Sequence, residues 1–110
     1  MPIEQDAFFS MLGLAMRAGQ LTFGEDSVRK AITSGTAGLV LLDDGASENT
    51  KKRMRDSCSY YAVQLLETEK TRLGAAVGRG GRMSVAVKKG PLCDRLIELA
   101  RQNDAATLEG

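Results

Sequence analysis

Residues 23–32 combine residue types and a spacing that suit the recognition of an anion or of a polar ligand edge. Gly24 can adopt the backbone angles of a tight turn, and Glu25 and Asp26 follow in what would be the first turn of a helix. The start of a helix leaves backbone N–H groups without partners, and Lys30 would place an ammonium group one turn later. The stretch therefore predicts a ligand-binding helix start, although an ordinary capped amphipathic helix would explain the same residues.

A second candidate is a glycine-rich basic stretch over residues 78–83. Arg79 and Arg82 flank Gly80 and Gly81, and Met83 follows as an apolar tip. Arginines of this kind contact phosphates or stack on bases, and an apolar side chain can pack on a base that has left its stack. A further basic surface is predicted on the helix that follows Ser47 or Asn49, and it carries Lys51, Lys52, Arg53 and Arg55.

Catalytic and metal-binding chemistry finds little support in the composition. The chain has no histidine, which excludes histidine base catalysis and histidine metal sites. Cys58 and Cys93 lie far apart and match no metal-ligand spacing, so we expect two reduced thiols. Asp43 and Asp44 could bind a metal, but adjacent acids at the end of a strand are more typical of a solvated turn. We predict a protein that is not an enzyme, with no cofactor and no metal.

The charge distribution indicates where a polyanion would bind. The net charge is +1 over 110 residues, but residues 48–91 hold ten Lys or Arg against four acids, a local charge of +6. A basic middle in a nearly neutral protein is typical of a local footprint for a polyanion, and a solvated surface without a partner remains the alternative. We see no signal peptide and no apolar run long enough to span a bilayer, so we expect a cytoplasmic protein with no membrane partner.

The elements that would position these residues alternate along the chain. Apolar periodicity predicts helices over residues 6–18 and 24–34, a basic helix to about residue 57, a helix from about residue 69, and a last helix after Pro91. Short extended or continuous apolar runs predict strands over residues 21–23, 39–42, 60–66 and 83–87. Such alternation predicts an α/β fold with a largely parallel or mixed sheet and helices on both of its faces, and we expect a mixed four-stranded sheet. We expect one domain over residues 1–103 and a frayed tail over residues 104–110.

The order and spacing of five segments also carry a family resemblance. They are LGLAMRAGQL, FGEDSVRKAI, LVLLDDGASENTKKRM, CSYYAV and LGAAVGRGGRMSVAV. Together they resemble the YlxQ-like bacterial RNA-binding proteins of the ribosomal protein L-seven-Ae superfamily, over roughly residues 8–100. The resemblance implies a three-layer α/β/α sandwich, binding of RNA kink-turns or related internal loops, and association with ribosomal or other structured RNA in a ribonucleoprotein.

The resemblance also implies a set of RNA-binding residues. In the wider superfamily a Gly-x-Asn-Glu-x-x-Lys motif at the second helix start reads sheared G·A pairs. Gly24 and Lys30 match that motif, whereas Asp26 and Ser27 stand where the asparagine and the glutamate would be. The RNA-binding residues that we predict are Gly24, Glu25, Asp26, Ser27, Lys30, Arg79, Gly80, Gly81, Arg82 and Met83.

Our leading hypothesis is therefore a monomeric, single-domain protein whose partner is RNA. Two other hypotheses use the same scaffold: a protein–protein adaptor whose basic region serves an acidic partner, and the substrate-binding domain of an RNA-modifying enzyme that lacks the catalytic half. A steep salt dependence of RNA binding would distinguish a polyanion footprint from an adaptor.

Overall fold

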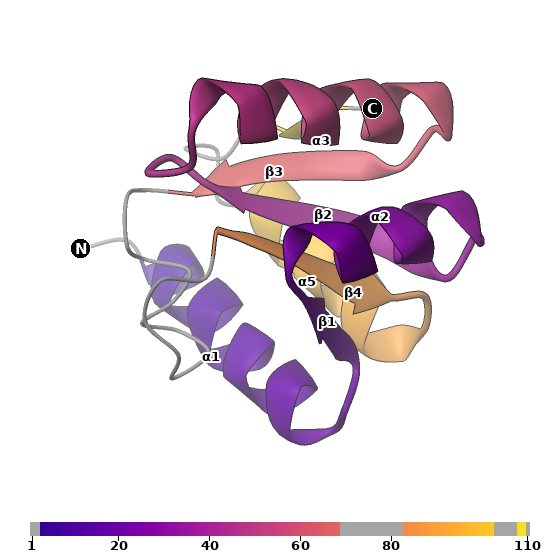
Figure 1. Ribbon diagram of the computed structural model, residues 1–110. Helices are drawn as coiled ribbons and strands as arrows, with labels where there is room; N and C mark the ends of the chain where they lie inside the picture. The colour runs from indigo at the N-terminus through magenta and orange to yellow at the C-terminus, as the bar shows by residue number, and fades with distance from the viewer. Residues whose placement is uncertain (1–2, 69–82, 103–107, 110) are drawn as a thin grey trace.

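The computed structural model describes residues 3–68, 83–102 and 108–109, and within these ranges helices and strands alternate (Figure 1). The elements are α1 (Ile3–Arg17), β1 (Leu21–Phe23), α2 (Glu25–Thr33), β2 (Ala37–Asp43), α3 (Glu48–Tyr60), β3 (Gln64–Thr68), β4 (Ser84–Lys88), α5 (Pro91–Gln102) and β5 (Leu108–Glu109). The helix predicted from about residue 69 falls outside the described residues.

The sheet is mixed and has the strand order β1-β4-β2-β3-β5. The central strand β2 runs parallel to β3 and antiparallel to β4, while β1 and β5 pair antiparallel with β4 and β3. The mixed sheet of four strands is confirmed, and the two-residue strand β5 adds a short outer pairing. Leu108 and Glu109 belong to the tail that was predicted to fray, and both align with β3. The domain boundary at residue 103 stays a prediction.

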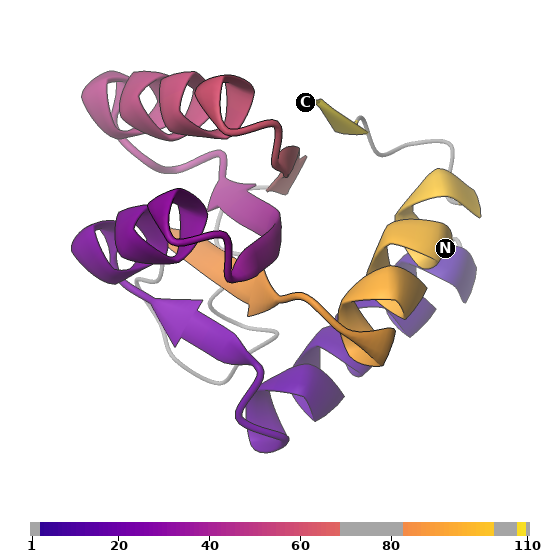
Figure 2. The ribbon, with the colours of Figure 1, turned by 90° about the vertical axis from the view of Figure 1, so that its right-hand side faces the viewer.

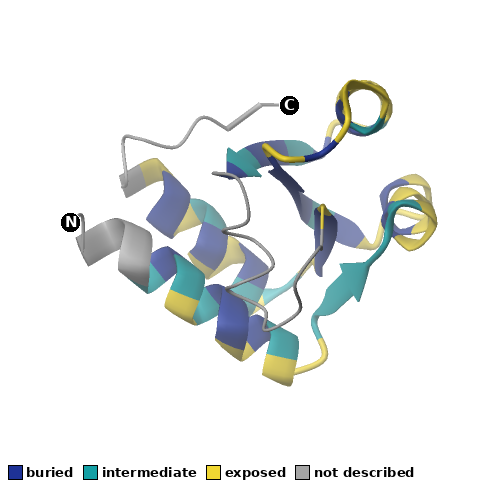
Figure 3. Cartoon of the chain, turned by 60° about the vertical axis from the view of Figure 1, so that its left-hand side comes forward, coloured by how far each residue is buried: buried dark blue, intermediate teal, exposed yellow. Residues whose placement is uncertain are grey.

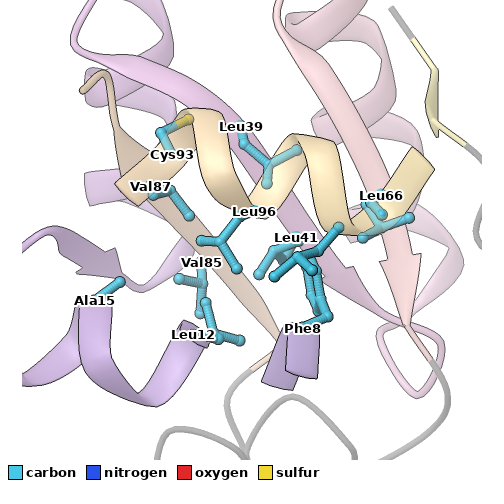
Figure 4. Packing of buried hydrophobic residues seen from close by; sticks show 12 residues of the cluster. Phe8, Leu12, Ala15, Leu39, Leu41, Leu66, Val85, Val87, Cys93 and Leu96 are labelled. Atoms are coloured by element: carbon cyan, nitrogen blue, oxygen red, sulfur yellow. The ribbon is translucent and has the colours of Figure 1, made fainter. Parts of the chain in front are cut away.

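Two hydrophobic clusters, one on each face of the sheet, make the protein a three-layer α/β/α sandwich. Helices α1 and α5 cover one face and helices α2 and α3 cover the other, as Figure 2 shows. In β2, Leu39 and Leu41 pack toward α1 and α5 (Figure 4), whereas Val40 and Leu42 pack toward α2 and α3. This alternation places every second side chain of a strand on the same face. It explains why the run from residue 39 to residue 42 is apolar without interruption, and why buried residues line the inner sides of the helices in Figure 3.

Helices α1, α2 and α3 all end in the same left-handed turn. The residues in the left-handed conformation are Gly19 (φ 72°), Gly35 (φ 81°) and Ala62 (φ 57°). In α3, the N–H of Ala62 donates to the carbonyl of Ser59 (3.4 Å) and the N–H of Val63 to that of Cys58 (2.9 Å), which is the Schellman pattern. The strand predicted over residues 60–66 is wrong at its start, because α3 continues to Tyr60 and the turn delays β3 until Gln64.

A register shift lies near the start of β2, between Ala37 and Leu39. Gly38 occupies that shift, and α5 passes directly over it. A Cβ atom at Gly38 would lie 2.8 Å from the Sγ of Cys93 and 3.1 Å from the Cγ of Lys89. The close approach of α5 to β2 therefore requires a glycine here.

None of the helices in the described ranges combines the length and the apolar character that crossing a bilayer requires. Within the same ranges, both cysteines are free and buried, and they lie on opposite faces of the sheet, Cys58 in α3 and Cys93 in α5. Their places on opposite faces of the sheet agree with the prediction of two reduced thiols. Burial raises the pKa of each thiol to about 11, so both stay protonated at neutral pH.

Candidate functional site

Several chain segments meet at the end of the sheet where β2 and β3 finish. Since these strands are parallel, Asp43 aligns with Thr68, and the N–H of Asp43 donates to the carbonyl of Met83 at 2.8 Å. On the far side of β4, Phe23 aligns with Val85, so Gly24 follows β1 at the same end. We call this end, formed by Gly24, Asp43, Thr68 and Met83, the site edge. The helix start at Gly24 and Met83, which directly precedes β4, therefore lie at the same end of the sheet.

The start of α2 has the geometry of an open helix N-terminus. Gly24 is the N-cap residue with φ 91° and ψ 143°, and no side chain caps the helix within the described chain. A left-handed φ of this kind explains why glycine precedes the helix, since other residues adopt it at a cost. Asp26 and Ser27, in the first turn, are exposed. The first N–H groups of α2 are therefore available to an acceptor, as an open N-terminus leaves them.

Glu25 has a different environment from its neighbours in that turn. Its carboxylate accepts hydrogen bonds from Thr50 Oγ1 (3.2 Å) and from the Nε and Nη2 atoms of Arg53, the latter at 3.0 Å, and lies 3.8 Å from Arg29 Nη1. The hydrogen bond from Arg53 holds the pKa of the Glu25 carboxyl below its ordinary value. Glu25 thus ties the start of α2 to α3, and its two oxygens are already occupied.

Lys30 is the one basic residue of α2 among the predicted RNA-binding residues. Its side chain is exposed, and within the described residues no carboxylate lies within ion-pair distance of its ammonium group. Lys30 follows the open helix start by one turn. The two features together offer backbone donors and a free positive charge on one surface of α2.

The cations of α3 form ion pairs with acidic side chains, so they do not make the free basic surface that was predicted from the sequence. The pairs join Lys52 to Asp56 (3.0 Å), Arg53 to Glu25, and Arg55 to Glu67 (2.8 Å), and Lys51 contacts Asp44 (3.1 Å) and Glu48 (3.6 Å). Each of these four cations has an acidic partner, so α3 presents less free positive charge than its composition indicates. The pairs of Lys52 with Asp56 and of Lys51 with Glu48 lie within α3 at helical spacing, so the sequence could have indicated them. The pairs of Arg53 with Glu25 and of Arg55 with Glu67 join separate elements, and they become apparent only in the fold.

The turn after β2 is fixed by its acidic residues. Asp43 is 1% exposed, and its carboxylate accepts a hydrogen bond from the N–H of Gly45 at 2.8 Å. The interpretation as a solvated turn is therefore wrong for Asp43 and fits only the exposed Asp44. The hydrogen bond to Asp44 raises the pKa of the mostly buried Lys51. These contacts brace the site edge against the start of α3.

Thr68 is a residue of the site edge that the sequence did not indicate as part of a binding site. It is 7% exposed, and within the described part of the chain its hydroxyl has no hydrogen-bond partner. Its place could have been inferred, because parallel strands end at the same edge of a sheet and Thr68 closes the strand beside β2.

The other predicted residues divide into one that is placed and four that are not. Met83 is 37% exposed and directly precedes β4. Arg79, Gly80, Gly81 and Arg82 lie outside the described residues. Within the described ranges, no three His, Cys, Asp or Glu side chains are grouped in a way that could hold a metal ion.

Comparisons with known proteins place this arrangement in a wider context. The family model described as the ribosomal protein L7Ae/L30e/S12e/Gadd45 family matches residues 6–96. The chain is 42% identical over 93 residues to the RNA-binding protein YlxQ of Bacillus subtilis (strain 168), covering 84% of this chain and 93% of that protein. A solved structure of a Bacillus halodurans protein of unknown function has a TM-score of 0.78 at 36% identity, covering 84% and 94% of the two chains. The 15.5kD RNA binding protein of Giardia lamblia shares the fold, with a TM-score of 0.75 at 14% identity over 96% of this chain and 91% of its own.

Proposed function

We propose that this chain, which belongs to the ribosomal protein L7Ae/L30e/S12e/Gadd45 family, binds structured RNA through its site edge. Membership of this family, which is non-enzymatic, agrees with the prediction that the protein is not an enzyme. The resemblance that the sequence carries to YlxQ-like proteins is confirmed by the match to the Bacillus subtilis protein. That relative is named as an RNA-binding protein, and we extend the same activity to this chain.

The observation that carries the proposal is the convergence of Gly24 and Met83 at one end of the sheet. The first offers the free N–H groups of α2, which suit phosphate oxygens or acceptor atoms of bases. The second offers an exposed apolar side chain on which an unstacked base can pack. Lys30 adds a positive charge without an acidic partner among the described residues. These are the three kinds of contact that a folded RNA with an extruded nucleotide requires.

The residues of the helix start divide into two roles. Asp26 and Ser27 are exposed and would face the RNA, whereas Glu25 would act indirectly by fixing α2 against Arg53 of α3. An ionised Asp26 can accept from a base amino group but cannot donate to N7 or O6 as an asparagine can. We therefore propose that the protein recognises a kink-turn-like RNA, with a lower affinity than an asparagine at position 26 would give.

The proposal extends to the residues before Met83 and to the cellular setting. We propose that Arg79 and Arg82, with Gly80 and Gly81 as hinges, clamp the RNA backbone beside Met83. We further propose that the protein acts as a monomer in the cytoplasm, in association with the ribosome. Neither a cofactor nor a metal has a role in this binding.

Titration of a labelled kink-turn RNA and of a plain duplex of equal length tests the proposal. Asp26→Asn should tighten binding of the kink-turn about tenfold, through one removed repulsion and one gained hydrogen bond worth about 1.4 kcal/mol together. Lys30→Gln should weaken binding and reduce the slope of log K against log salt by about one unit.

The matched control is Lys52→Gln, because Lys52 carries the same charge on the exposed face of α3 and pairs with Asp56 at 3.0 Å. It should leave both RNA affinities close to those of the wild type. If Lys30→Gln and Lys52→Gln have equal effects, the recognition surface is not on α2. If all variants bind RNA with a shallow salt dependence, the adaptor hypothesis is preferred.

A further inference from the structure

A pocket of about 190 Å³ lies at the end of the sheet opposite the site edge. It is bounded by the last turn of α2, the first residues of β2, the turn from α3 into β3, and Lys89 after β4. An engineered cavity of about 150 Å³ is known to hold benzene, and drug-sized ligands occupy pockets of about 300 Å³ or more. The volume here thus suits one planar ring system.

Exposed aromatic side chains adjoin this pocket. Tyr61 lines the pocket and is 44% exposed, and Tyr60 beside it is 82% exposed. The two rings form an edge-to-face pair with centroids 4.9 Å apart. The pairing holds Tyr61 in place while leaving its ring accessible. Accessible aromatic rings next to a small pocket are typical of surfaces on which single nucleotide bases stack.

The charges around the pocket favour a ligand with a phosphate at its outer end. Lys89 lines the pocket, Lys88 precedes it, and no carboxylate lies within ion-pair distance of either ammonium group in the described part of the chain. None of the described residues that line the pocket is acidic. Helices α2 and α3 both end here, and although the turns that follow them hydrogen-bond several of their last carbonyls, the negative ends of the two helix dipoles still repel a phosphate and attract an amino group. A base with an exocyclic amino group would therefore point inward and its phosphate would lie at the lysines.

We infer that this pocket binds one unpaired nucleotide of an RNA strand, with the base stacked on Tyr61 and the phosphate at Lys88 and Lys89. Adenine, cytosine and guanine carry an exocyclic amino group of the kind that the helix ends favour, and uracil lacks it. The site is separate from the site edge, because the full length of β2 divides them. An RNA long enough to reach both ends of the sheet would contact the protein twice.

Intrinsic tyrosine fluorescence gives a direct test, because the chain has two tyrosines and no tryptophan. Both tyrosines adjoin the pocket, so their emission reports this site alone. A short oligoadenylate should quench the emission in a saturable manner, and oligouridylate of equal length should bind more weakly. Lys89→Gln should reduce the salt slope of oligoadenylate binding by about 0.7. Tyr61→Leu should weaken binding of a labelled oligoadenylate about five- to a hundredfold.

Two controls separate this site from the site edge and from damage to the fold. Lys52→Gln removes an equal charge away from the pocket and should leave the quenching unchanged. Asp26→Asn should alter kink-turn binding and leave the quenching unchanged, so either site can fail independently of the other. Absence of quenching at saturating oligoadenylate would overturn the inference, and so would equal effects of Lys89→Gln and Lys52→Gln.

Discussion

Ala62 is the residue at which a single substitution should make the protein more stable. It holds φ 57° at the end of α3, in the turn where α1 and α2 have Gly19 and Gly35. A left-handed conformation costs a residue with a Cβ atom about 1–2 kcal/mol. Glycine avoids that cost but loses about 0.4–1 kcal/mol through the greater freedom of the unfolded chain. Ala62→Gly should therefore raise the free energy of unfolding by about 0.5–1 kcal/mol.

The same chain provides reciprocal variants. A Cβ atom added at Gly19 or at Gly35 would meet nothing within 4 Å, so alanine at either position would add backbone strain without a steric clash. Gly35→Ala should consequently lower the free energy of unfolding by about as much as Ala62→Gly raises it. The two helix ends share one hydrogen-bond pattern, which makes the comparison a test of the backbone conformation alone.

Thermal unfolding followed by circular dichroism measures both effects. For a domain of this size, 1 kcal/mol corresponds to a change in Tm of about 4 °C. Ala62→Gly should shift Tm upward by about 2–4 °C, and Gly35→Ala should shift it downward by a similar amount. A lower Tm for Ala62→Gly, with the expected loss for Gly35→Ala, would show that Ala62 does not hold the left-handed conformation in solution.

Three further predictions concern the core, the contacts of Glu25 with α3, and the segment before β4. Val40→Asp should prevent folding, because Val40 is fully buried in β2 and an unpaired charge there costs several kcal/mol, whereas Lys52→Ala should stay within about 0.5 kcal/mol of the wild type in urea unfolding. Glu25→Gln should lower Tm by a few degrees at pH 7. Because the pKa of Glu25 is lowered in the folded state, the difference in Tm between the two proteins should shrink as the pH falls below 4.5 and through the folded pKa. A difference in Tm that does not change with pH would contradict a stabilising role of the ionised Glu25 carboxylate. The double variant Arg79→Ala, Arg82→Ala should keep its circular dichroism spectrum and reduce the salt slope of RNA binding by about two units, and an unchanged slope would remove these arginines from the site.

Hydrophobic patterning in the sequence predicted the layered fold correctly. The uninterrupted apolar run over residues 39–42 indicated a strand covered on both faces, and β2 contributes to both clusters. The strand boundary near Tyr60 was missed because helices usually stop at glycine, and the chain has Ala62 at the position where α3 ends. A left-handed alanine leaves no trace in the sequence pattern.

The sequence indicated the open start of α2 but not the role of each charge around it. Gly24, Asp26, Ser27 and Lys30 have the exposed or open positions that a binding surface needs. Glu25 was grouped with them because it shares their turn, yet its side chain reaches across to α3. Ion pairs between helices depend on the packing angle and on side-chain reach, which local spacing does not encode.

The order in which Gly38 and Cys93 are substituted decides whether the fold tolerates the two changes. Because a Cβ atom at Gly38 would lie 2.8 Å from the Sγ of Cys93, a side chain at position 38 is acceptable only after position 93 has become smaller. Cys93→Gly alone would leave a gap, whereas Gly38→Ala alone would push α5 away from the sheet. A change to larger residues at position 38 is therefore tolerated only if the substitution of Cys93 comes first, and the reverse order passes through a destabilised intermediate.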